Sequence, residues 1–144
     1  MLSLRQSFRE LVRLVGDDAA RRRRIDLHQD TRVRAIQLLK QNLSPAQCKQ
    51  FERCRYFDVV GGDTGCRYRI REGCQMNVEQ LDKSGRRVRI LCFMPEGHLA
   101  VGDVLLAQKL ALELFESETL KVAHKSPALE FFLDRENPGW RRFR

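Results

Sequence analysis

Apolar residues in the first third of the chain recur every three or four positions, which is the period of an amphipathic helix. Residues 4–15 carry one such stripe, made of Leu4, Phe8, Leu11 and Val15. Val33, Ile36 and Leu39 form a second stripe, which predicts a helix from a cap at Asp30 or Thr31 to about Gln41. These two segments are therefore expected to be helical.

A third helix is predicted by the sequence Ser44-Pro45-Ala46-Gln47. Serine is a favoured N-cap, proline suits the first helical position, and a glutamine at the third position can bond back to the cap amide. The helix is expected to end near Arg53, with Cys48 and Phe51 in the core.

The pattern then changes to alternation and to short apolar runs separated by turn residues, which predicts strands. Short connections between consecutive strands favour an antiparallel meander. Four strands are expected, at residues 57–60, 66–70, 76–81 and 86–93, with glycine-containing turns at 61–65, 71–73 and 82–85.

The last third is predicted to be helical again. Asp103 can cap a long apolar helix reaching about Glu116, which suits the cover of a sheet face, and Ser126-Pro127 is typical of a further helix start. We therefore expect an α+β fold in which a three- to four-stranded antiparallel β-meander is covered by a long C-terminal helix and flanked by N-terminal helices.

Three segments are expected along the chain. Residues 1–29 read as an N-terminal amphipathic helix and basic linker, residues 30–136 as the α+β domain, and residues 137–144 as a basic aromatic tail. Trp140 and Phe143 stand among arginines in that tail, a combination that can stack on bases but that also suits a simple closure of the core edge.

A longer pattern links the strand region with the last long helix. It consists of the run Phe57-x-Val59-x-Gly61-x-x-Thr64-Gly65-x-x-Tyr68-x-Ile70, then Asn77-Val78, Cys92, Pro95, Asp103 and Leu106-Ala107-Gln108-Lys109. It resembles a group of short bacterial proteins to which no function is attached. The resemblance covers roughly residues 43–120 and implies a single structural unit.

Charge adds a functional expectation to this fold. Lys and Arg number 27 against 19 acidic residues, which gives a net charge of +8, and 21 of the 27 are arginine. Because the guanidinium fork matches phosphate and carboxylate geometry, this composition favours an anionic partner. The alternative is that arginine replaces lysine with no functional demand.

Arginines alternate with other residues on two of the predicted strands. Side chains alternate across a strand, so Arg67, Arg69 and Arg71 should share one sheet face, with Arg87 and Arg89 beside them. Five guanidiniums on one face would suit a phosphate backbone. The alternative is a solvated face, partly neutralised by Glu72 and Glu79. A second basic candidate is the run Arg21, Arg22, Arg23 and Arg24.

No reaction class is supported by the remaining motifs. Asp63-Thr64-Gly65 is the tripeptide of aspartic proteases, but flanking glycines explain it better as a hairpin turn. A zinc site would need widely spaced ligands without the usual close pairs, and a cysteine nucleophile would rest on Cys92 with His98 alone. The possible zinc ligands are Cys66, Cys74, Cys92 and His98. We therefore expect no cofactor and favour a non-enzymatic role.

The cysteine count is odd and no secretory signal precedes the cysteines, so a cytoplasmic location is expected, and no run of 18 apolar residues predicts a membrane span. The sequence thus predicts non-enzymatic binding of a polyanion, with nucleic acid favoured, through the arginine-rich sheet face. The alternative is a protein-interaction or regulatory module for an acidic partner protein.

Overall fold

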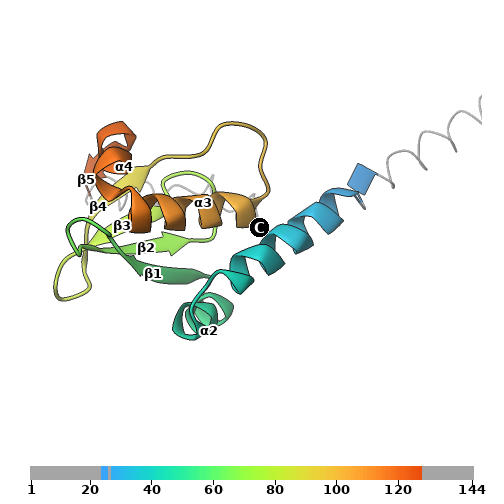
Figure 1. Cartoon of the computed structure of the whole chain (residues 1–144), viewed down its shortest axis with the longest axis horizontal. Helices are drawn as coiled ribbons and strands as arrows, with labels where there is room; N and C mark the ends of the chain where they lie inside the picture. Colours follow the sequence, from blue (N-terminus) through green and yellow to red (C-terminus); the bar gives the residue numbers. More distant parts are fainter. Residues whose placement is uncertain (1–23, 26, 128–144) are drawn as a thin grey trace, which may run out of the picture.

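The computed structural model describes residues 24–25 and 27–127. It has an α+β architecture with a five-stranded antiparallel sheet in the order β1-β2-β3-β4-β5, and α3 lies across one sheet face (Figure 1). The elements after a first helix at residues 27–41 are α2 (Pro45–Cys54), β1 (Tyr56–Val60), β2 (Arg67–Arg71), β3 (Val78–Leu81), β4 (Arg87–Cys92), α3 (Val101–Leu114), α4 (Glu116–Val122) and β5 (His124–Pro127).

The predicted meander is confirmed for β1 to β4, but the predicted strand count is wrong because β5 adds a fifth strand. β5 pairs with β4, with Ser126 opposite Ile90 and Pro127 opposite Arg89. The Ser-Pro pair that predicted a helix start therefore lies in a strand. Proline is tolerated there because β5 is an edge strand, where the missing N–H interrupts no continuing ladder.

The predicted capping box of α2 is confirmed. The Ser44 hydroxyl accepts a hydrogen bond from the Gln47 backbone N–H, and the Gln47 side-chain oxygen accepts one from the Ser44 backbone N–H.

Two glutamines of α2 also cover the outer edge of β1. Gln47 Nε2 donates to the Asp58 carbonyl oxygen and the Asp58 N–H donates to Gln50 Oε1, both at 2.8 Å. Side-chain amides thus complete the edge of the sheet at this point.

The helix predicted from Asp103 to Glu116 begins earlier and ends earlier. α3 starts after an extended Ala100, so Asp103 lies within its first turn. The helix ends at Phe115, whose backbone is not helical, and α4 begins at the next residue. Leu105 and Leu112 of α3 are fully buried in the core. Their neighbours in that cluster include Leu39, Phe51, Phe57, Val59, Tyr68, Ile70, Val78 and Leu91. A core therefore lies between α3 and one sheet face.

A buried amide pair ties α3 to the start of β3. Asn77 Nδ2 donates to Gln108 Oε1 at 2.8 Å, Gln108 Nε2 donates to Asn77 Oδ1 at 3.0 Å, and Gln108 also donates to the Phe93 carbonyl oxygen. Each side-chain amide therefore donates through its nitrogen and accepts through its oxygen, so that neither atom is buried without a hydrogen-bond partner.

The first helix is already present at residue 27, ahead of the predicted cap. The Thr31 hydroxyl donates to the Leu27 carbonyl oxygen four residues earlier, as it does inside a helix rather than at its start. The boundary predicted after residue 29 thus falls inside this helix. Ala35 and Leu39 face the body, and Gly102 of α3 allows a close backbone approach to Ala35.

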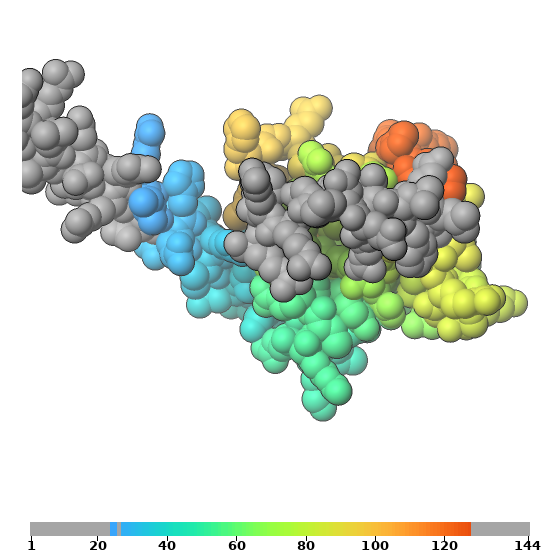
Figure 2. All heavy atoms as spheres, turned by 180° about the vertical axis from the view of Figure 1, so that it is seen from behind, coloured from blue at the N-terminus to red at the C-terminus, as the bar shows by residue number. Residues whose placement is uncertain are grey.

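The rest of helix 27–41 projects from the body. It extends from one end of the molecule, while the turn at residues 82–86 protrudes at the other end (Figures 1 and 2). Its exposed side chains include Leu27, Val33 and Leu38. Among the residues that the structure describes, no helix combines the length and apolar character needed to cross a membrane.

Candidate functional site: an arginine face on the sheet

The sheet face opposite α3 carries a group of arginines and carboxylates, which we call the arginine face. It comprises Tyr56, Asp58, Arg67, Arg69, Arg71, Glu79 and Arg87. Strand register brings these residues together, because Arg69 stands opposite Asp58 on β1 and opposite Glu79 on β3. The prediction that Arg67, Arg69 and Arg71 share a face is therefore confirmed.

Asp58 is shared by two arginines of β2. Arg69 donates through both edges of its fork, with Nε to Oδ1 at 2.8 Å and Nη2 to Oδ2 at 3.2 Å. Arg67 adds one bond from Nη2 to Oδ2, also at 3.2 Å. Burial raises the pKa of Asp58, but the bonds and charges of the arginines outweigh burial and hold it below 3.8.

Glu79 on β3 is shared in the same way by arginines on its two neighbouring strands. Arg71 of β2 bonds it bidentately at 2.8 and 3.2 Å, and Nη1 of Arg87 on β4 lies 3.0 Å from Oε1. Burial again raises the pKa, and the two guanidiniums more than reverse this, so that the pKa of Glu79 lies below 4.5. The carboxylate therefore stays ionised in the sheet at neutral pH.

Tyr56 supports two of these guanidiniums from β1. The guanidinium carbons of Arg69 and Arg71 lie 4.2 and 5.1 Å from the ring centroid, within the range of cation–π attraction. The hydrogen bond to Asp58 raises the pKa of Arg69 further above its ordinary value. Ring and carboxylates together fix the orientation of the forks.

Arg89 does not belong to this face, which corrects the expectation of five arginines together. β4 carries one extra residue, Val88, between the positions opposite Leu81 and Gln80. This bulge leaves Arg87 opposite Leu81, on the arginine face, and places Arg89 opposite Gln80, on the other face. Arg89 is exposed there.

The four arginines differ in exposure. Side chains of Arg67 and Arg71 are 46% and 40% exposed, whereas those of Arg69 and Arg87 are 20% and 13% exposed. Among the described residues, four guanidiniums meet two carboxylates on this face, which gives these six side chains a net positive charge. Of the basic run predicted as a second site, Arg24 is exposed and Arg21, Arg22 and Arg23 lie outside the described residues, as do Trp140 and Phe143.

A second polar cluster, which sequence reasoning missed, explains the glycine-rich loop between β1 and β2. Glu116, fully buried at the start of α4, accepts bonds from the N–H groups of Asp63 and Thr64 at 2.9 and 2.8 Å. It also accepts from the hydroxyls of Thr64 and Tyr68 at 2.5 and 2.6 Å. We call this cluster the Glu116 latch, because it fastens the loop to α4.

The loop composition follows from this latch. A Cβ at Gly61 would overlap the Glu116 carboxylate, and one at Gly62 would overlap the Glu113 carbonyl oxygen. Asp63 Oδ2 accepts a bond from the Ser117 N–H at 2.8 Å. Asp63-Thr64-Gly65 is thus part of a structural loop, which agrees with the hairpin interpretation of the tripeptide.

All five cysteines are free thiols. Within residues 24–25 and 27–127, no group of three or more His, Cys, Asp or Glu side chains is arranged to hold a metal ion. Comparison of the chain with protein-family models, with curated proteins and with solved structures returned no match.

Proposed function

We propose that the arginine face binds a polyanion through phosphate contacts, with nucleic acid as the favoured partner. The observation that carries this proposal is that two half-exposed guanidiniums, those of Arg67 and Arg71, are held in fixed orientations on one sheet face. Phosphate contacts supply most of the affinity of sequence-independent nucleic-acid binding, and arginine provides them in bidentate form.

The exposures divide the arginines into two roles. Arg69 and Arg87 are mostly covered and hold Asp58 and Glu79, so they act as positioning residues. Arg67 and Arg71 are about half exposed. Arg67 uses a single N–H on Asp58, which leaves its other donors for an incoming phosphate. Because ion pairs already order the forks, binding loses less side-chain entropy there than at free arginines.

A titration at two salt concentrations tests this proposal. Fluorescently labelled single-stranded RNA and duplex DNA are titrated with the full chain and with the double variant Arg67→Ala/Arg71→Ala. The double variant should bind at least about tenfold more weakly and lose about two from the slope of log K against log salt, because each phosphate contact contributes about one.

Arg89→Ala is the matched control, since it removes the same charge from the opposite sheet face. It should lose much less affinity than either Arg67→Ala or Arg71→Ala. Equal losses for Arg89→Ala and Arg67→Ala, or no binding of either nucleic acid at low salt, would contradict a role for the arginine face.

A second candidate function, docking of an acidic partner protein, is favoured by one observation on helix 27–41. A groove of about 300 Å³ on this helix combines apolar Val33 and Ile36 with basic Arg32 and Lys40. An acidic peptide with apolar anchors fits that combination. Binding of such a peptide that Val33→Glu abolishes and Arg67→Ala leaves unchanged would favour this function over the first.

A further inference from the structure

Two apolar residues on the arginine-face side of the sheet are buried without belonging to the core. Leu81 stands opposite Arg67 and Ile90 stands opposite Glu79, so both lie on the arginine face. Ile90 is fully buried and Leu81 is 5% exposed. Neither residue is part of the core cluster between α3 and the sheet. This end of the arginine face is therefore apolar and shielded from water.

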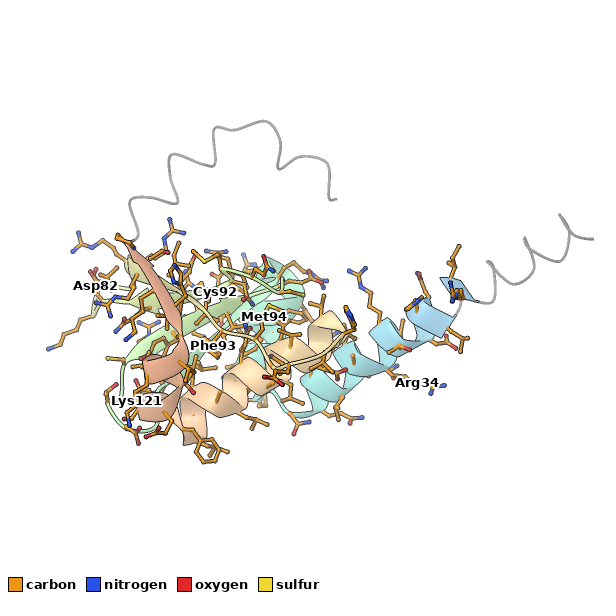
Figure 3. All side chains as sticks on the ribbon, turned by 90° about the horizontal axis from the view of Figure 1, so that it is seen from above. Arg34, Asp82, Cys92, Phe93, Met94 and Lys121 are labelled. Atoms are coloured by element: carbon orange, nitrogen blue, oxygen red, sulfur yellow. The ribbon has the colours of Figure 1, made fainter. Side chains whose placement is uncertain are left out.

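No helix in the described part of the chain provides that shield. α3 and α4 lie on the other sheet face, where Lys121 marks α4 in Figure 3. Helix 27–41 meets α3 at Ala35, and α2 packs against β1, which β2 and β3 separate from β4. A fully buried side chain on a sheet face needs a further layer above it. Val60, on the same face at the β1 edge, is 57% exposed, so the covered patch is local to β3 and β4.

The chain itself continues beside this patch. Ser126 of β5 stands opposite Ile90, and β5 ends one residue later at Pro127. The segment that follows Pro127 therefore starts next to the covered patch. The distance from β5 to β2 is three strand spacings, about 15 Å, which about five extended residues span. Residues 128–144 are thus long enough to reach across β4 and β3 as far as Arg67.

The sequence directly after Pro127 has the composition that such a cover requires. Residues 128–134 contain four large apolar side chains, two acids and no base, namely Leu129, Phe131, Phe132, Leu133, Glu130 and Asp134. The apolar side chains match Ile90 and Leu81. The acids match a face on which the described charged side chains are four arginines and two carboxylates. Basic residues return at Arg135, so the match is confined to this first stretch.

We propose that residues 128–134, which we call the C-terminal cover, fold back over β3 and β4 and pack on Ile90 and Leu81. The acids of the C-terminal cover then face the half-exposed arginines Arg67 and Arg71. Because these arginines are also the phosphate contacts of the proposed function, the cover competes with a polyanion for them. The competition rests on the proposed function, whereas the packing on Ile90 and Leu81 does not. The arginine face is thus autoinhibited by a segment of its own chain.

A double-mutant cycle in the full chain tests the packing. Ile90→Ala and Phe132→Ala each remove apolar contacts, and urea denaturation gives the midpoint of every variant. The double variant should lose clearly less than the sum of the single losses, because the second change removes contacts that the first has already broken. Leu105→Ala is the matched control, since Leu105 is equally buried but belongs to the core on the other face. Its loss should add to that of Phe132→Ala, and additive losses for both pairs would overturn the proposal.

A fluorescent reporter gives a second measurement that does not depend on stability. Trp140 is the only tryptophan of the chain, so Phe132→Trp/Trp140→Phe moves the fluorophore into the C-terminal cover. Its emission should be shifted to the blue and shielded from acrylamide quenching. Adding Leu133→Glu should remove the shielding, whereas Phe143→Glu, outside the C-terminal cover, should preserve it. Emission typical of a fully hydrated tryptophan in the reporter itself would overturn the proposal.

Titration with single-stranded RNA tests the competition. Glu130→Gln/Asp134→Asn weakens the hold of the C-terminal cover on the arginines and should increase RNA affinity at least about fivefold. Asp30→Asn/Glu96→Gln is the matched control, because it removes the same charge from two exposed positions elsewhere, and its gain should stay below about twofold. Equal gains would overturn the competition. If the cycle and the reporter show the packing but no variant binds RNA, the proposed function fails and the C-terminal cover stands.

Discussion

Glu79 and Glu116 are both buried carboxylates, but the protein stabilises them by different means. Glu79 lies between two guanidiniums, whereas Glu116 accepts four hydrogen bonds from backbone amides and hydroxyls that carry no charge. The Glu116 latch satisfies its carboxylate completely and fixes a loop. In the described residues, the arginine face has more guanidiniums than carboxylates, and it is the face that we propose binds a polyanion. A buried glutamate is thus stabilised by neutral donors in one region and by opposite charges in the other.

Replacing Glu116 should have the largest effect on stability. Glu116→Leu keeps the volume and removes every acceptor, so four donors that the structure places beside the carboxylate lose their partner. We expect a loss of about 4 kcal/mol in the free energy of unfolding, measured by urea denaturation. Glu116→Gln keeps one acceptor oxygen and should lose about half as much. Nucleic-acid affinity measured below the transition should not change in either variant.

Replacing Glu79 should separate stability from binding. Glu79→Gln leaves Arg71 and Arg87 without their counter-charge, and we expect a loss of about 2 kcal/mol because both arginines keep some access to water. The same change increases the positive charge of the arginine face, so polyanion affinity should rise. A variant that is destabilised without binding more tightly would contradict the comparison between the two carboxylates.

Alkaline pH should weaken the Glu116 latch. Burial, followed by the bond and charge of Glu116, raises the pKa of Tyr68 above 10.0. The unfolded chain therefore loses this proton first, and stability should fall as the pH rises past about 10. Tyr68→Phe removes this contribution, so its stability should depend less on pH above 10 than that of the wild type, although it is less stable at pH 7.

Acid should act on both regions together. The pKa values of Glu116 and Glu79 lie below the ordinary value of 4.5. Their stabilising contribution is therefore complete above about pH 4.5 and is lost as the pH falls through their folded-state pKa values. Thermal unfolding followed between pH 7 and pH 3 should show little change from these groups until about pH 4.5, and then a steep decrease.

The smallest effect on stability is expected at Arg67. Arg67 is half exposed and shares Asp58 with the better-placed Arg69, so Arg67→Ala should cost less than about 0.5 kcal/mol in urea denaturation. A loss as large as that of Glu79→Gln would show that Arg67 is a structural residue, which would weaken its proposed role as a phosphate contact.

Local signals in the sequence were sufficient for most elements. The capping box at Ser44, the alternation along β2 and the turn glycines each act within a few residues, and each gave the correct element. β5 was missed because its Ser-Pro pair is also a helix start signal, and only pairing with β4 decides between the two. Phe115 ends α3 in a segment whose apolar pattern alone predicts continuation to Glu116.

The candidate site was predictable on one strand only. Arg67, Arg69 and Arg71 share a face because of strand geometry, which the sequence shows directly. The placement of Arg89 depends on one extra residue, Val88, which no periodicity reveals. The ion-pair partners Asp58 and Glu79 depend on strand register, and Glu116 lies 48 residues from Tyr68, so their roles require the folded chain.

The amides that Gln47 and Gln50 place on Asp58 have a consequence for self-association. Amyloid-like growth requires that each molecule offer two open strand edges, one to receive a neighbour and one to extend the stack. In the described chain, Gln47 and Gln50 occupy the outward C=O and N–H of Asp58 at the centre of the β1 edge. This edge is therefore a poor template for an added strand, which hinders growth of a fibril through the native sheet.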